Sequence, residues 1–132
     1  MKYINLLLVL LSLMTGSLMA QEPIVANLMV KDLAGISGKE VLMIKVEYPP
    51  GGADPVHKHN APGFIYVLDG SIVMQVKGGA EVTLKPGQTF YESSDDVHVV
   101  GRNASKTKPA QFLVFLVKDK GTSFFIPVNA SP

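Results

Sequence analysis

Three histidines are the residues of this chain whose type and spacing could support chemistry. His57 and His59 are two positions apart, with Lys58 between them, so on a β-strand their side chains project from the same face and can bind one metal ion. A third ligand must come from elsewhere, and His98 is the only histidine left. Imidazole suits several metals, so the ligand type does not choose among them. The histidines predict a site for one divalent transition metal (Fe, Mn, Zn, Ni or Cu).

The composition excludes several other kinds of chemistry. The chain has no cysteine, so thiolate ligands and thiol nucleophiles are absent. Its glycine-rich turns lack phosphate-binding spacing, and no context supports a Ser-His-Asp triad. The formal net charge is only +1, whereas a nucleic-acid partner requires a basic excess. We therefore expect a small-molecule ligand or substrate and no nucleic acid.

The segments around the histidines resemble the two motifs of the cupin family. Residues 51–70, GGADPVHKHNAPGFIYVLDG, are similar to the first motif: Gly, five residues, HxH, three or four residues, Glu, six residues, Gly. Residues 87–103, GQTFYESSDDVHVVGRN, are similar to the second motif, with looser agreement. This resemblance implies a single cupin-type jelly-roll β-barrel in which His57, His59 and His98 ligate one metal ion.

One ligand of the family pattern is missing. The glutamate of the first motif falls on Gly63 or on Phe64, and neither residue can coordinate a metal. Two interpretations follow: three histidines with solvent or substrate completing the metal, or a replacement ligand from elsewhere. Glu92 is the better replacement candidate, because it lies on the strand leading toward His98, and it is also the only clear candidate for a general base. Gln75 is the weaker one.

The elements that must position these residues are short β-strands. Runs of β-forming residues alternate with Gly, Pro and Asp, and no window of residues 21–132 shows helical periodicity. Asp69-Gly70 is a strong two-residue hairpin signal, so the strands on its two sides are expected to pair. The sequence thus predicts one all-β domain with strands at residues 25–30, 41–48, 64–68, 72–76, 82–84, 89–92, 97–100, 112–117 and 124–126.

The remaining residues of interest have structural explanations. Asp54 lies beside a proline and is predicted to be a turn residue. Four aromatic residues are predicted to lie in the core: Phe64, Tyr66, Phe112 and Phe115. Consecutive residues of their strands are apolar, which suggests that both faces of each strand are buried.

The N-terminal segment predicts export. Lys2 is followed by an apolar run at residues 4–14, and Ala20 ends a stretch of small and apolar residues, which is the layout of a secretory signal peptide. We expect residues 1–20 to be removed and residues 21–132 to form the domain, without a membrane partner. Lys2 is the only charged residue removed, so the net charge would fall to zero. The predicted location is secreted or periplasmic.

Two function classes follow from the resemblance. One is a metal-dependent enzyme of oxygenase, isomerase or lyase type that acts on a small molecule. The other is a non-catalytic cupin that binds a small ligand. Cupins commonly pair through an outer sheet face, so a homodimer is expected.

Overall fold

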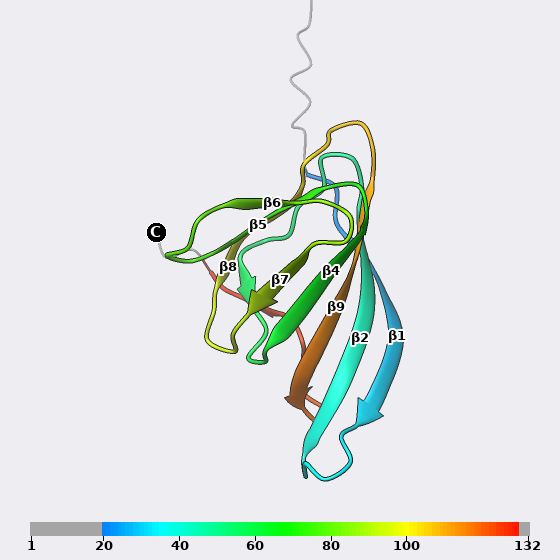
Figure 1. Cartoon of the computed structure of the whole chain (residues 1–132). Helices are drawn as coiled ribbons and strands as arrows, with labels where there is room; N and C mark the ends of the chain where they lie inside the picture. The colour runs from blue at the N-terminus through cyan, green and yellow to red at the C-terminus, as the bar shows by residue number, and fades with distance from the viewer. Residues whose placement is uncertain (1–19, 130–132) are drawn as a thin grey trace, which may run out of the picture.

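The computed structural model describes residues 20–129, which form ten β-strands arranged in two antiparallel sheets (Figure 1). The large sheet has the order β1 (Ile24–Asp32), β2 (Lys39–Tyr48), β9 (Ala110–Asp119), β4 (Gly63–Asp69) and β7 (Thr89–Glu92). The small sheet has the order β10 (Ile126–Pro127), β3 (His57–Lys58), β8 (His98–Asn103), β5 (Ile72–Val76) and β6 (Val82–Leu84). The all-β jelly-roll prediction is confirmed. The proposed signal peptide lies outside the described residues, apart from Ala20.

The predicted strands agree closely with the observed ones. The predicted bounds of β5, β6 and β7 are those of the structure, whereas β1, β2, β4 and β9 extend further at both ends or at one end. The strand predicted at 97–100 is β8, which begins one residue later and ends three residues later, and the strand predicted at 124–126 is β10, at Ile126–Pro127. The two-residue strand β3, which carries His57, was not predicted, because so short a strand has no periodic pattern. No helix that could cross a lipid bilayer occurs in residues 20–129.

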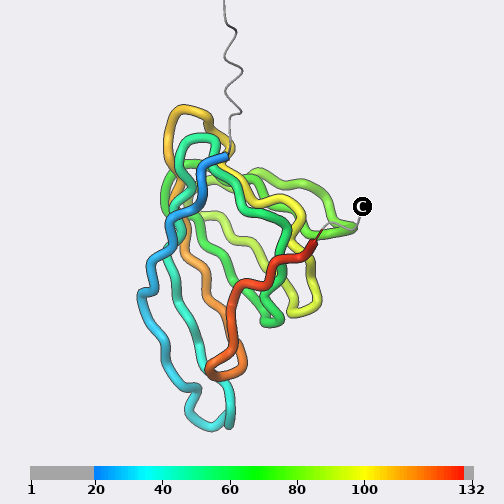
Figure 2. Tube along the Cα trace, turned by 180° about the vertical axis from the view of Figure 1, so that it is seen from behind, coloured from blue at the N-terminus to red at the C-terminus, as the bar shows by residue number. Residues whose placement is uncertain are grey.

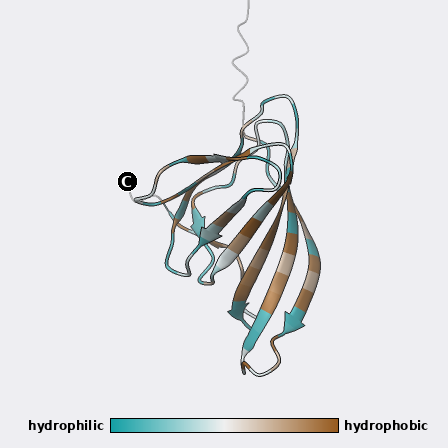
Figure 3. Ribbon diagram, in the orientation of Figure 1, coloured by the Kyte–Doolittle hydropathy of each residue, from teal (hydrophilic) through white to brown (hydrophobic). Residues whose placement is uncertain are grey.

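The core lies between the sheets and rests on the long ladder of β2 and β9. Their ten pairs run from Lys39 with Asp119 to Tyr48 with Ala110, and alternate residues of both strands are buried. Because side chains alternate between the two faces of a strand, every second residue of β2 and β9 points toward the small sheet, and most of these residues are apolar. Figure 3 shows the hydrophilic colour at the ends of β2 and β9 that lie farthest from the small sheet.

The hairpin predicted at Asp69-Gly70 is wrong. β4 pairs with β7 and β9 in the large sheet, whereas β5 pairs with β6 and β8 in the small sheet. The turn therefore carries the chain from one sheet to the other. Gly70 has a φ of 69°, and a Cβ there would lie 2.6 Å from the Pro109 carbonyl oxygen, so glycine is required by this crossing.

The outer face of the large sheet carries aromatic residues that were predicted to be core. Phe64 is 47% exposed and Tyr66 is 43% exposed, while their neighbours Ile65 and Val67 point inward and are buried. Phe112 is buried as predicted. The prediction failed for Phe64 and Tyr66 because an apolar outer face cannot be distinguished from a second core-facing side by composition alone.

The C-terminal segment connects the two sheets. After β9 the chain turns and crosses to the small sheet, where β10 pairs with β3 (Figure 2). Ile126 is the partner of Lys58, and Pro127 is the partner of His57. The segment thereby lies against the strand that carries His57, directly before His59.

Candidate metal centre

The three histidines lie together between the sheets. His57 and His98 are Cα partners on β3 and β8, and their ring centroids are 4.9 Å apart. The ring of His59 lies 4.8 Å from that of His57. The structure therefore brings together the three residues that the sequence singled out, with the His57 and His98 rings fully buried.

Backbone carbonyl groups orient two of the imidazoles. Nδ1 of His57 donates to the Pro55 carbonyl at 2.8 Å, and Nδ1 of His59 donates to the Phe124 carbonyl at 2.5 Å. A hydrogen bond of this kind fixes the tautomer, because the proton stays on Nδ1 and the lone pair on Nε2 becomes available. Both rings thus present Nε2 in the form that binds a metal.

His98 is the side chain whose environment calls for a ligand. Both of its ring nitrogens are buried and form no hydrogen bond among the described residues, although Oε1 of Glu92 lies 3.4 Å from Nδ1. A buried polar atom without a partner is costly, and native structures rarely contain one without a reason. A metal ion that accepts the lone pair of one nitrogen would remove this cost for that nitrogen.

Burial keeps the three histidines neutral. It lowers the pKa of His57 and of His59, although their bonds to carbonyl groups oppose the shift. For His98, burial together with the neighbouring histidines lowers the pKa to about 3. Neutral imidazoles bind a metal without first losing a proton, so the metal-free site is already in the ligating form.

Glu92 lies between two of the histidines. Its carboxylate oxygens are 3.4 Å from Nε2 of His59 and 3.4 Å from Nδ1 of His98. The side chain is buried, and burial raises the pKa of Glu92 to about 7, with Asp96 and Asp54 adding to the shift. A bound cation would favour the charged carboxylate, so the position fits a fourth ligand.

Gln75, the weaker candidate, points elsewhere. Its neighbour Met74 lines the site, and side chains alternate along β5, so Gln75 lies on the opposite face of the strand. Its Nε2 donates instead to the Gly79 carbonyl at 2.9 Å.

Asp54 is a member of the site that the sequence did not identify. One carboxylate oxygen of Asp54 and one nitrogen each of His57 and His98 all lie within 4.8 Å of one another, a group that could hold a metal ion. Asp54 does not lie in a free turn: its amide donates to the Gly101 carbonyl at 2.8 Å, and this segment runs along β8 toward His57. The only feature of the sequence that could have indicated a role for Asp54 is its position three residues before His57.

The Asp54 carboxylate is held by Tyr48. The Tyr48 hydroxyl, fully buried, donates to Oδ2 of Asp54, and burial keeps the pKa of Tyr48 well above its usual value. Burial also raises the pKa of Asp54 to about 6, although the bond from Tyr48 opposes this. The Tyr48 hydroxyl and the His98 ring pack closely against Gly101. A side chain at position 101 would collide with them, because a Cβ there would lie 2.8 Å from the Tyr48 hydroxyl and 3.1 Å from Cε1 of His98.

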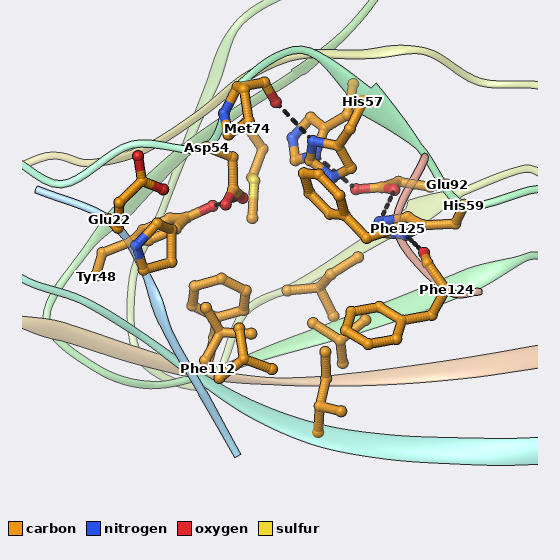
Figure 4. A pocket seen from close by; sticks show the side chains of 18 residues that line it. Glu22, Tyr48, Asp54, His57, His59, Met74, Glu92, Phe112, Phe124 and Phe125 are labelled. Atoms are coloured by element: carbon orange, nitrogen blue, oxygen red, sulfur yellow. Dashed lines mark hydrogen bonds and ion pairs between the residues drawn. The ribbon is translucent and has the colours of Figure 1, made fainter. Parts of the chain in front are cut away.

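These groups form one end of a cavity of about 240 Å³. Figure 4 shows Tyr48 and Asp54 on one side of His57, and His59 with Glu92 on the other. Phe125 stacks on His57 with ring centroids 4.4 Å apart. The donor set of neutral imidazoles and carboxylates fits a divalent transition metal. The ligand atoms that lie within 4.8 Å of one another belong to Asp54, His57 and His98, and His59 is not in that group.

The fold and the site define a small all-β protein with a candidate metal centre between its sheets. The family model described as the cupin domain matches residues 44–116, more than half of the chain. The chain therefore belongs to the cupin family. Comparison with curated proteins gave no match.

Solved structures show the same fold. DMSP lyase DddQ from Ruegeria pomeroyi DSS-3 is 24% identical with a TM-score of 0.58, over 66% of this chain and 42% of that one. An uncharacterized Klebsiella pneumoniae protein with a double-stranded beta-helix domain is 17% identical with a TM-score of 0.63, over 81% and 86%. The polyketide cyclase RemF from Streptomyces resistomycificus is 18% identical with a TM-score of 0.56, over 78% and 81%. This chain thus spans less than half of the DMSP lyase.

Proposed function

We propose that this cupin is a metal-dependent enzyme that acts on a small molecule. His57, His59 and His98 hold one divalent transition metal, and Glu92 serves as the fourth protein ligand. The observation that carries the proposal is the pair of buried, unpartnered nitrogens of His98, beside two Nε2 atoms freed by backbone hydrogen bonds and a buried carboxylate. A structural site would be closed, whereas this one faces a cavity.

The charge of the ligand set suits catalysis. Three neutral imidazoles and one carboxylate leave about one positive charge on a divalent ion. When bound, the metal would act as a Lewis acid on an oxygen of the substrate and would acidify bound water. The protein must then supply a proton acceptor that is not itself a ligand.

Asp54 is the residue we propose for that task. Tyr48 fixes its carboxylate toward the metal-binding histidines, and no other hydrogen bond to it is made within residues 20–129. Reactions that begin with proton removal, such as those of lyases and isomerases, would use such a group directly. Asp54 therefore favours these classes over an oxygenase. The fold accommodates such enzymes, since the similar structures include a lyase and a cyclase.

We also propose that the protein acts outside the cytoplasm, as a secreted or periplasmic domain. β1 begins at Ile24, after the predicted cleavage position, so removal of residues 1–20 would leave all ten strands intact. The mass of the protein purified from its native compartment tests this. A chain beginning at Gln21 is expected, and a chain beginning at Met1 would contradict export.

We propose that the protein forms a homodimer through the outer face of the large sheet. Successive cross-strand partners form a row across all five strands: Met29, Met43, Phe115, Phe64 and Tyr91. Met29, Phe64 and Tyr91 are about half exposed, which is unusual for a contiguous apolar surface left in water. A second copy seated on this row would cover it.

Elemental analysis tests the metal proposal first. The protein purified from its native compartment is expected to carry close to one metal ion per chain, and a His57→Ala/His59→Ala variant is expected to carry none. The element found then selects the reactions to screen. Absence of metal from the wild-type protein, even after reconstitution, would overturn the proposal. Saturable ligand binding without turnover would instead indicate the non-catalytic binding module.

A further inference from the structure

The cavity beside the candidate metal centre has two chemically different parts. The histidines, Asp54 and Glu92 form its polar end. The opposite wall consists of aliphatic and aromatic side chains from the inner face of the large sheet, among them Ile44, Val46 and Phe112. Phe124 of the C-terminal segment adds a further apolar surface. A molecule bound at the metal would therefore place the rest of its body against hydrocarbon.

Apart from the histidines, the ionisable side chains that line the cavity are all acidic. Glu22, Asp54 and Glu92 contribute carboxyl groups to its lining, whereas no lysine or arginine is among the described residues that line it. A phosphate or a second carboxylate on a ligand would find no cationic side chain, and it would lose its hydration against an apolar wall. Only the group that contacts the metal itself can carry a negative charge at low cost.

The volume limits the size of the ligand. A protein cavity of about 150 Å³ accommodates benzene. The cavity here, about 240 Å³, leaves room for one ring, or a short branched chain, with a few substituents.

We infer that the site accepts a small molecule with a metal-chelating oxygen head and a neutral, apolar body of about one ring, and that it rejects phosphorylated or polyanionic compounds. This inference rests on the proposed metal centre. The head lies toward His57, His98 and Asp54, and the body lies against Ile44, Phe112 and neighbouring side chains.

Three hydroxamates that share one metal-binding head test this inference on the full mature domain loaded with zinc. Their bodies are a phenyl ring (benzohydroxamate), a methyl group (acetohydroxamate) and an anionic phosphonomethyl group (phosphonoacetohydroxamate). Isothermal titration gives the dissociation constants. Burial of the ring should make benzohydroxamate bind about tenfold more tightly than acetohydroxamate, or better. The phosphonate should bind at least about tenfold more weakly than acetohydroxamate.

Two variants distinguish the contribution of the apolar wall to binding from that of the hydroxamate group that all three compounds share. Phe124→Ala should reduce the advantage of benzohydroxamate severalfold while zinc stays at one per chain, because the Phe124 carbonyl that accepts from His59 belongs to the backbone. Phe64→Ala, on the outer face, should leave all three constants unchanged.

The outcomes distinguish the two proposals. Zinc bound at one per chain together with equal affinities, a preference for the phosphonate, or no hydroxamate binding at all would overturn the inference and leave the metal centre intact. A chain that binds no zinc or other divalent metal would overturn both.

Discussion

Gly63 and Glu92 face each other as cross-strand partners on β4 and β7. A Cβ built on Gly63 would lie 3.8 Å from Cβ of Glu92 and 3.9 Å from its Oε2. The side chain of Glu92 therefore lies in contact with the space that a side chain at position 63 would enter, while Cδ2 of Leu116, at 3.2 Å, is the nearest atom to that Cβ. The first cupin motif of this chain lacks its glutamate at position 63, but a carboxylate reaches the same region from the neighbouring strand.

Exchange of these two residues is expected to preserve the metal centre. Glu92→Gln should weaken metal affinity by at least about tenfold, since even outer contacts of a metal ligand contribute that much. Adding Gly63→Glu to Glu92→Ala should restore most of the affinity, because the carboxylate returns from the other strand. Equilibrium dialysis with elemental analysis measures both. A Glu92→Gln variant with wild-type affinity would show that Glu92 is not a ligand.

The sequence could locate the histidines and single out Glu92 as a candidate ligand, but it could not identify Asp54 as part of the site. His57 and His59 follow from spacing within one short segment, and His98 was the only remaining histidine. The contact between Glu92 and the position of Gly63 depends on the β4–β7 ladder, and the contact of Asp54 with His98 depends on β3 lying beside β8. Such cross-strand relationships join residues far apart in sequence, and local patterns do not specify strand pairing.

The contribution of Glu92 to the stability of the metal-free protein should fall as the pH rises from about 4.5 to 7. The pKa of Glu92 is raised from 4.5 to about 7 by burial, so in this window the folded state binds more protons than the unfolded state. Stability falls with rising pH under that condition, by about 3 kcal/mol at most. Chemical unfolding of chelator-treated wild type and Glu92→Gln, at several pH values, measures the difference.

Comparison with Glu92→Gln is necessary because His98 acts in the opposite direction. The pKa of His98 is lowered from 6.5 to about 3. Between these two pH values the unfolded state binds more protons than the folded state, so the contribution of His98 makes the folded state more stable as the pH rises from about 3 to 6.5. The histidines and Asp54 titrate in both proteins, so their own contributions are removed from the difference. The coupling of Glu92 to His59 and His98, each 3.4 Å away, remains in it. A stability difference that stays constant between pH 4.5 and 7 would contradict the raised pKa of Glu92.

Lys118 should support the metal centre from a distance. Its Nζ donates to Glu40 at 2.6 Å and to the Thr122 carbonyl at 2.7 Å, which holds the turn leading to Phe124. Because the Phe124 carbonyl accepts from His59, Lys118→Met should lower the melting temperature and weaken metal affinity severalfold. Lys120→Met is the matched control, since its pair with Asp32 is exposed. Unchanged metal affinity in Lys118→Met would show that the turn does not position His59.

The outer face of the large sheet gives a prediction about assembly. Phe64→Glu places a charge in the middle of the apolar row, beside Tyr91, whose ring lies 5.3 Å from that of Phe64. In a symmetric dimer the new carboxylate would be buried in the interface or would face the same carboxylate of the second subunit. The variant should therefore be monomeric at concentrations where the wild type is dimeric. Light scattering after gel filtration measures the mass. Ile36→Glu, in the turn between β1 and β2, should remain dimeric, and a monomeric wild type would refute the dimer.

Asp54 can be tested independently of the metal. If it accepts a proton without being a ligand, Asp54→Asn should keep one metal per chain and lose most of the turnover, about a hundredfold or more. Tyr48→Phe removes the hydroxyl that orients the carboxylate, so it should lower turnover less while also leaving the metal in place. Elemental analysis and single-turnover rates on the substrate found in the screen distinguish these effects. Loss of metal from Asp54→Asn alone would instead assign Asp54 as the ligand, with His57 and His98, and would leave Glu92 as the group that receives the proton.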